Sequence, residues 1–178
     1  MCSAAAKSDI LHRLKLAAKS YLLMTLHRPY NVDRPEQLAA ILQALQECGR
    51  PVVFPVHPRT RKMIREFNIL VTDNIRMIDP LGYLDFLSLQ EHASLVLTDS
   101  GGIQEETTYL GVPCLTARPN TERPVTISMG TNQLVESEST VLVQAMQASL
   151  SGSRPKKKSP PLWDGHTAGR IVKVFRHA

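Results

Sequence analysis

Short apolar runs alternate with segments of helical character along most of the chain. The runs are bounded by Pro, Gly or charged residues, as is typical of strands buried on both faces of a parallel sheet. They lie at residues 21–26, 51–56, 75–78, 94–97, 114–117 and 133–135. The helical segments lie at residues 7–19, 33–48, 60–67, 83–92, 104–110 and 139–150. This alternation predicts an α/β fold: a doubly wound, Rossmann-like parallel sheet of about six strands with right-handed crossovers.

The helix predicted over residues 33–48 has clear signals at both ends. Asp33 is a favourable N-cap residue, Pro35 fits the first turn, and Glu36 is placed for a capping box. Gly49 is a natural stop. We therefore expect a helix that Asp33 caps and that packs one apolar face on the sheet.

We expect residues 1–178 to form a single domain, because 178 residues are enough for one domain with a substantial core. Residues 151–162 are rich in Ser, Pro and Lys and predict a basic linker. Residues 163–178 contain a predicted C-terminal helix from about residue 168 to 176. Its apolar side chains are Ile171, Val172 and Phe175. They need an apolar partner, so we expect this helix to pack back on the sheet or to swap into a second copy, giving a homodimer.

Composition narrows the class of protein. The formal net charge is +5, and part of this excess is a local cluster within the basic linker. The remaining charge is mixed in sign, so the pattern suits a small phosphorylated ligand and argues against a nucleic-acid partner. Three cysteines without a Cys-x-x-Cys spacing favour a reduced, cytoplasmic setting. The chain has no apolar run near the ~20 residues that span a membrane, and its first residues lack the apolar core of a signal peptide.

The segment Ser100-Gly101-Gly102 follows the apolar run 94–97 and precedes a predicted helix. A strand, a glycine turn and a helix start direct backbone N–H groups and the positive end of a helix dipole at one spot. Glycine lets an oxyanion approach the backbone closely. A carboxylate about one turn later can accept both hydroxyls of a ribose, so the segment favours a nucleotide. In the alternative interpretation, Ser100 is an ordinary N-cap and the nearby acidic pair, residues 105–106, complements the dipole.

Basic side chains follow three other predicted strands. His27 and Arg28 come after residues 21–26, and His57 comes after residues 51–56. A loop with Arg123 follows the run 114–117. Open α/β sheets bind ligands at the carboxyl ends of their strands, so we expect these residues to share a site. In the alternative interpretation, His27 and Arg28 belong to a loop that happens to be basic, and His57 has a structural role. The separation of the two histidines fits no metal-binding motif, and no metal or cofactor is expected.

Five motifs together resemble the non-hydrolysing UDP-N-acetylglucosamine 2-epimerases. They are His-Arg-Pro at 27–29, Phe-Pro-Val-His-Pro at 54–58, Ile-Asp-Pro-Leu-Gly-Tyr-Leu-Asp-Phe at 78–86, Thr-Asp-Ser-Gly-Gly-Ile-Gln-Glu-Glu at 98–106 and Thr-Glu-Arg-Pro at 121–124. The resemblance covers nearly the whole chain and is to the C-terminal, UDP-binding domain of the family. It implies one half of a glycosyltransferase-B-type fold.

The resemblance also implies roles for individual residues. Ser100, Gly101 and Gly102 would hold the diphosphate of UDP, and Glu106 would bind the ribose hydroxyls. Arg123 would face the phosphates and the sugar. Because neighbouring helical residues point about 100° apart, only one residue of the acidic pair can face the mouth of the turn.

Further matched positions complete the implied site. His27 would also face the phosphates and the sugar and is the one catalytic candidate in this chain. Arg28 is assigned to the UDP-binding residues. Phe86 would lie beside the uracil, with the backbone of Leu81 reading its edge; an aromatic residue on a helix is otherwise a core residue. His57 falls in the region that forms a regulatory nucleotide-sugar site in some family members.

The implied reaction converts UDP-N-acetylglucosamine into UDP-N-acetylmannosamine by elimination and re-addition of UDP, in the biosynthesis of cell-surface polysaccharides. The family's N-terminal domain supplies the carboxylates that remove the C2 proton, and it has no counterpart among these residues. We therefore expect the chain to bind UDP or UDP-N-acetylglucosamine and to be inactive alone, its partner being that domain or a split partner chain. The alternatives are a non-catalytic UDP-sugar-binding module and half of a glycosyltransferase.

Three positions depart from the family pattern. Tyr30 and Val125 stand where the family usually has Glu, and Glu136 stands where it usually has Gly. We expect all three departures to affect whether the completed enzyme has the full activity of the family.

Overall fold

The computed structural model describes residues 5–152 and 160–176. Six strands form one parallel sheet in the order β3-β2-β1-β4-β5-β6. Their bounds are β1 Leu22–Thr25, β2 Val52–Pro55, β3 Ile75–Ile78, β4 Leu95–Thr98, β5 Cys114–Ala117 and β6 Asn132–Val135. The bounds of each strand agree to within two residues with those of a predicted apolar run. Because all six strands pair in parallel, the predicted fold class is confirmed.

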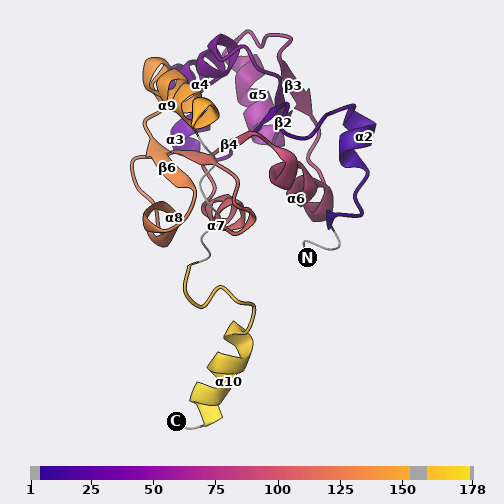
Figure 1. Cartoon of the computed structure of the whole chain (residues 1–178). Coiled ribbons are helices and arrows are strands. Elements are labelled where there is room, and N and C mark those ends of the chain that lie inside the picture. The colour runs from indigo at the N-terminus through magenta and orange to yellow at the C-terminus, as the bar shows by residue number, and fades with distance from the viewer. Residues whose placement is uncertain (1–4, 153–159, 177–178) are drawn as a thin grey trace.

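Helices cover both faces of the sheet (Figure 1). They are α2 Ile10–Leu14, α3 Pro29–Val32, α4 Pro35–Glu47, α5 Pro58–Glu66, α6 Tyr83–His92, α7 Gly101–Leu110, α8 Val125–Ser128, α9 Ser139–Ser151 and α10 Thr167–Arg176. None of the helices in the described part of the chain is long and apolar enough to cross a membrane.

Alternate strand residues serve two separate apolar clusters, because successive side chains of a strand point to opposite faces. Leu22 and Met24 of β1 belong to the larger cluster, which includes apolar residues of α4 and α9. Leu23 belongs to the smaller cluster, which includes Ile10 of α2 and Leu89 of α6. Both faces of the strand are therefore buried, which explains why the strands are continuous apolar runs and not alternating ones.

The predicted start of α4 is wrong. Its N-cap residue is Arg34, with no side-chain capping bond, and the helix begins at Pro35. The Asp33 carboxylate instead pairs with the guanidinium of Arg59, 2.5 Å away. Two short helices, α3 and α8, also form, which we did not predict from the sequence. In α3, Pro29 is the first helical residue, a position that suits its fixed φ.

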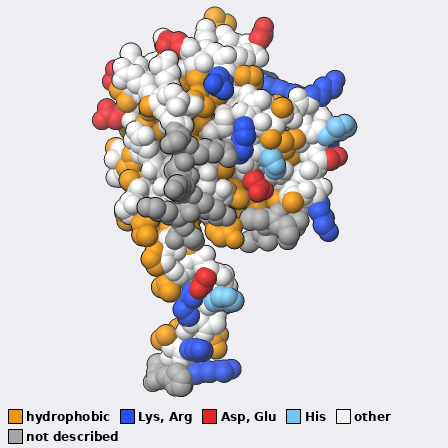
Figure 2. Space-filling view, viewed as in Figure 1, with side chains coloured by type: hydrophobic (Ala, Val, Ile, Leu, Met, Phe, Trp, Pro, Cys, Tyr) orange, Lys and Arg blue, Asp and Glu red, His pale blue; other side chains and the backbone are white. Residues whose placement is uncertain are grey.

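The C-terminal helix α10 projects away from the sheet and its covering helices (Figure 1). None of its residues is buried, and Ile171, Val172 and Phe175 are 50%, 48% and 78% exposed. Figure 2 shows apolar side chains on this projecting segment. The expected packing of α10 on the sheet is therefore not what the structure shows, and a swap into a second copy stays a prediction. The predicted linker at 151–162 falls mostly outside the described residues.

Shortening the chain to end at Leu162, which removes α10 and keeps the buried Pro160, should leave the free energy of unfolding of the monomer within about 0.5 kcal/mol of its original value, because surface changes away from packed features have effects of that size. Urea unfolding of the two chains measures the difference. Light scattering of the full chain tests the swap, with a dimer expected only while α10 is present. A loss of several kcal/mol on shortening would show that α10 packs on the domain in solution.

Candidate functional site

The centre of the sheet is the switch point of its topology. From the central pair β1 and β4, the strands β2 and β3 follow toward one edge of the sheet, and β5 and β6 follow toward the other edge. Open α/β sheets bind ligands in the crevice at such a point, beyond the carboxyl ends of the strands. Thr25 of β1 and Thr98 of β4 are register partners, and their hydroxyls lie 2.9 Å apart. His27 and Ser100 each follow two residues later, so they leave the sheet side by side.

The N-terminus of α7 is exposed at this switch point. Ser100 is its N-cap residue, but the hydroxyl makes no capping bond, and its backbone N–H donates to the Thr98 hydroxyl at 3.0 Å. Gly101 and Gly102 are the first two helical residues, so the helix begins earlier than the predicted residue 104. Ser100 therefore occupies the N-cap position, as the alternative interpretation predicted, but its hydroxyl does not make the hydrogen bond of an ordinary cap.

The two glycines are not required by the protein's own packing. Neither has a positive φ. A Cβ at Gly102 would meet no atom within 4 Å, and one at Gly101 would meet only Oε2 of Glu122, at 3.9 Å. What glycine provides here is open space in front of the first N–H groups of a ten-residue helix. Such a surface suits an anion.

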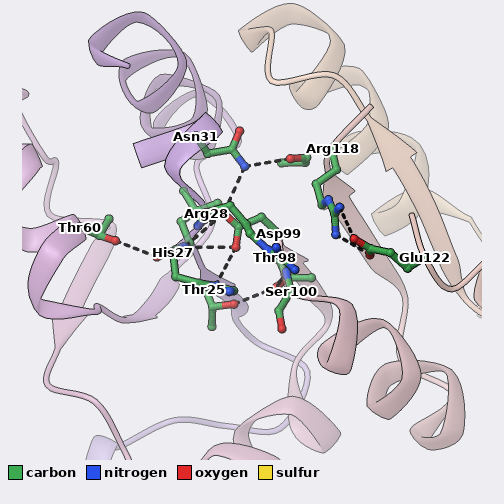
Figure 3. Close-up of polar contacts among 12 residues, drawn as sticks. Thr25, His27, Arg28, Asn31, Thr60, Thr98, Asp99, Ser100, Arg118 and Glu122 are labelled. Carbon is green, nitrogen blue, oxygen red and sulfur yellow. Dashed lines mark hydrogen bonds and ion pairs between the residues drawn. The ribbon is translucent and has the colours of Figure 1, made fainter. Parts of the chain in front are cut away.

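Asp99 is the residue that sequence reasoning missed. Its carboxylate is fully buried between β4 and α7 and contacts four donor groups of three residues (Figure 3). The backbone N–H of His27 lies 3.2 Å from both oxygens, and Nδ1 of His27 lies 2.9 Å from Oδ1. The backbone N–H of Arg28 and the side-chain amide of Asn31 donate to Oδ2 at 2.9 and 3.2 Å. Asp99 therefore holds the end of β1 against the start of α7.

The charge of Asp99 is stabilised by these donors. Burial by itself raises the pKa of this carboxyl, but hydrogen bonds from His27, Arg28 and Asn31 together outweigh it and hold the pKa below its usual range. Asp99 is thus an ionised acceptor in the interior. A signal for it was present in the sequence, since it is a carboxylate two residues after the apolar run 94–97.

The two neighbouring glutamates of α7 face different elements. Glu106 accepts from the side-chain amide of Gln90 at 2.5 Å and from the hydroxyl of Tyr83 at 3.2 Å, both on α6. Glu105 pairs instead with Nε of Arg123 at 2.9 Å. The structure therefore separates the two glutamates as the helix geometry predicted, and it gives Arg123 a protein partner.

A second ion pair lies beside the start of α7. Arg118, at the end of β5, makes two bonds of 2.9 and 2.8 Å to the carboxylate of Glu122 (Figure 3). These bonds lower the pKa of Glu122 to about 2. Because Oε2 of Glu122 lies near Gly101, this pair forms one rim of the surface at the start of α7.

The other predicted residues lie on both sides of this centre. Arg28 is the N-cap residue of α3 and contributes its backbone N–H to Asp99. Leu81 and Phe86 are partly buried against the smaller apolar cluster, and Phe86 shares α6 with the partners of Glu106. His57 caps α5, where its Nδ1 accepts from the backbone N–H of Arg59 at 3.2 Å. His57 lies beyond β2 and is not brought into the cluster around Asp99.

Two of the three departures from the family pattern line one cavity of about 480 Å³. Tyr30 and Glu136 contribute to its wall together with Arg118. Tyr30 also stacks under Arg34, whose guanidinium carbon lies 5.1 Å from the ring centre. No three His, Cys, Asp or Glu side chains within residues 5–152 and 160–176 are grouped so that they could hold a metal ion.

Comparison with known proteins identifies relatives over nearly the whole chain. The profile of the family UDP-N-acetylglucosamine 2-epimerase matches residues 2–176. A UDP-N-acetylglucosamine 2-epimerase of Methanocaldococcus jannaschii is 41% identical over 165 residues, which are 88% of this chain and 44% of that protein. A UDP-2,3-diacetamido-2,3-dideoxy-D-glucuronate 2-epimerase of Pseudomonas aeruginosa is 41% identical over 133 residues, which are 73% of this chain and 37% of that protein.

A solved structure agrees with these relatives. The crystal structure of the Methanocaldococcus jannaschii UDP-GlcNAc 2-epimerase in complex with UDP-GlcNAc and UDP superimposes with a TM-score of 0.87 and 37% identity, covering 99% of this chain and 51% of that one. The α/β domain is thus one half of the glycosyltransferase-B-like epimerase fold. The chain belongs to the UDP-N-acetylglucosamine 2-epimerase family, and it spans about half the length of the relatives it matches.

Proposed function

We propose that this chain is the C-terminal, UDP-binding half of a UDP-N-acetylglucosamine 2-epimerase. The observation that carries the proposal is the unobstructed N-terminus of α7 at the switch point of the sheet, where glycine is needed neither for φ nor for packing. A diphosphate would sit on the N–H groups of Gly101 and Gly102 and beside the hydroxyl of Ser100. The relative from Methanocaldococcus jannaschii was crystallised with UDP-GlcNAc and UDP, which supports the assignment.

The nucleoside would extend from this diphosphate along the contact between α6 and α7. Glu106 lies one to two turns beyond the glycines and faces α6, where it would accept the ribose hydroxyls. Phe86 and Leu81 lie on or just before α6 and would flank the uracil. Arg123 would exchange its contact with Glu105 for a phosphate oxygen. These placements use one helix pair and need no other domain.

In the reaction, this half would stabilise the leaving UDP. Negative charge develops on the diphosphate as its bond to the sugar breaks, and preorganised N–H groups at a helix N-terminus lower the free energy of that charge. Arg123 and His27 would add charge and a hydrogen bond. The base that removes the C2 proton would come from the other half of the enzyme, a fused domain or a partner chain.

A second candidate is a UDP-sugar-binding module without epimerase activity. The observation that favours it is the cavity lined by Tyr30 and Glu136, where two residues that depart from the family pattern meet. Both candidates use the same UDP site, and they differ in whether the completed enzyme removes the C2 proton. His57, remote from the cluster around Asp99, stays a candidate for a regulatory nucleotide-sugar site.

Glu106→Ala should weaken UDP binding by about 10- to 100-fold, since a hydrogen bond to a charged group contributes about 1.5–3 kcal/mol. The matched control is Glu105→Ala, which removes the adjacent carboxylate on another face of the same helix. Its expected effect is less than about threefold, as for an exposed ion pair. Titration calorimetry with UDP measures both.

Because Glu106 accepts from the buried Gln90, thermal unfolding must accompany the titration. Glu106→Gln keeps an acceptor for Gln90 while removing the charge, and it should give an intermediate affinity in a fully folded protein. Equal weakening by the two alanine substitutions would contradict the proposed ribose contact. A wild-type chain that binds no UDP at millimolar concentration would contradict the site as a whole.

A further inference from the structure

His27 and Asp99 form a histidine–carboxylate pair at the ligand edge of the sheet (Figure 3). Nδ1 of His27 lies 2.9 Å from Oδ1 of Asp99. The carboxylate side chain is 0% exposed, whereas the histidine side chain is 44% exposed. One edge of the ring therefore contacts a buried charge, and the ring as a whole remains accessible from the crevice.

The surroundings of Asp99 dictate which ring nitrogen carries the hydrogen. The other partners of the carboxylate are the backbone N–H groups of His27 and Arg28 and the amide of Asn31, all of which donate. An ionised carboxylate only accepts, so Nδ1 of His27 must donate to it as well. In the neutral ring, Nε2 then carries the lone pair.

A second layer of contacts holds the carboxylate in place. The amide nitrogen of Asn31 also donates to the carbonyl of Ala117 at 2.9 Å, and its oxygen accepts from the hydroxyl of Ser137 at 2.8 Å. Asn31 is fully buried. Residues at or just beyond the carboxyl ends of β1, β4, β5 and β6 are thereby joined, so Asp99 cannot turn away from His27 without breaking several buried bonds.

We propose that Asp99 is a positioning residue that holds His27 in its Nδ1–H tautomer and directs Nε2 toward the ligand bound at the start of α7. The ligand part of this inference rests on the proposed function; the tautomer does not. Neutral His27 accepts at Nε2. When Nε2 takes up a proton, the imidazolium is paired with a carboxylate already in contact, and His27 becomes a donor toward a phosphate oxygen.

The test uses the full chain labelled with ¹⁵N, and long-range ¹H–¹⁵N correlations of the histidine rings at a pH of about 8, above the ordinary histidine pKa of about 6.5. His27→Asn identifies the signal of interest. Two other histidines serve as internal references. Nδ1 of His57 accepts from a backbone N–H, which requires the Nε2–H tautomer, and Nδ1 of His92 lies 2.8 Å from the carbonyl of Ser88, which requires the Nδ1–H tautomer.

Wild-type His27 should match His92 and differ from His57. In Asp99→Asn the new amide can present a donor to Nδ1, so His27 should move to the Nε2–H tautomer. The affinity for UDP should fall about tenfold in the same variant, the size of one hydrogen bond to a charged ligand. The control Asp33→Asn removes a partly exposed carboxylate paired with Arg59 and should change neither quantity.

An Nε2–H tautomer in the wild type overturns the proposal; the tautomer is read from the wild-type protein, and His27→Asn serves only to assign the signal. So does an unchanged tautomer in a folded Asp99→Asn protein. A changed tautomer with unchanged UDP affinity overturns the direction assigned to Nε2. If the wild type shows the Nδ1–H tautomer but binds no UDP, the pair is supported and the proposed function is what fails.

Discussion

Asp99→Ala should lower the free energy of unfolding by about 3–5 kcal/mol, the usual loss when one partner of a buried charged network is removed. The substitution leaves the N–H groups of His27 and Arg28 and the amide of Asn31 without their acceptor. Each buried unsatisfied donor costs about 1–3 kcal/mol. Urea unfolding followed by circular dichroism measures the change.

The matched control is Asp33→Ala. Asp33 also pairs with a cation, Arg59, but both side chains are partly exposed. An exposed ion pair contributes about 0–1 kcal/mol, so the control should remain close to the wild type. A similar small loss for both substitutions would show that the network around Asp99 contributes little to stability.

The Asp99 effect should depend on pH in a definite direction. The pKa of Asp99 is lowered in the folded state, by hydrogen bonds from His27, Arg28 and Asn31 that outweigh the effect of burial. Its contribution to stability is therefore fully present above the unfolded value of about 3.9 and is lost as the pH falls through the folded pKa. The difference between wild type and Asp99→Ala should shrink as the pH falls from about 5 to below about 4, through the folded pKa of Asp99. A difference that grows below about pH 5 would contradict this assignment.

The chain alone should bind UDP and leave the C2 hydrogen of UDP-N-acetylglucosamine unexchanged in heavy water. Around the start of α7, Asp99 pairs with His27, Glu106 with Gln90 and Glu122 with Arg118. Glu105, which Arg123 would leave for a phosphate oxygen, lies on another face of α7 than Glu106. A general base typically contributes about 10²–10⁴-fold to the rate, and orientation of the sugar between two domains contributes further. Without both, exchange should not exceed the uncatalysed background.

Proton NMR of the substrate at C2 measures the exchange, and titration calorimetry with UDP confirms in the same sample that the site is occupied. Adding the separately produced N-terminal half of a relative should restore exchange if this chain is half of an epimerase. Exchange by the chain alone would reveal a base among its own residues. His27→Gln would then abolish it if His27 is that base. Occupied UDP with no exchange in the completed enzyme would favour the non-catalytic binding module.

Much of the fold follows from the local pattern. Strands such as β1 are buried on both faces, so each leaves a continuous apolar run in the sequence, and alternation with helices predicts a parallel sheet. The position of the site follows for the same reason, because strand ends of a parallel sheet meet at one edge. Ser100 and the two glycines were found in this way, and the structure places them at the switch point.

The finer errors also have a physical reason. Asp33 is a residue type favoured at the N-cap, but its carboxylate forms an ion pair with Arg59, which lies 26 positions later in the chain. The angular spacing of a helix separates Glu105 from Glu106, yet only the contact of α7 with α6 shows which of them faces Tyr83 and Gln90. Local sequence propensity does not predict a side-chain contact with a residue of another helix or strand.

The sequence by itself determined the layered α/β architecture, the glycine-rich helix start at the edge of the sheet and the family resemblance, because burial pattern, glycine chemistry and short motifs are properties of neighbouring residues. Only the tertiary structure decided the role of Asp99. Its donors come from a segment about seventy residues earlier, and Asn31 in turn contacts Ser137, 106 positions away. A buried charge is stable only where distant donors converge on it, and that convergence exists once the strands have paired.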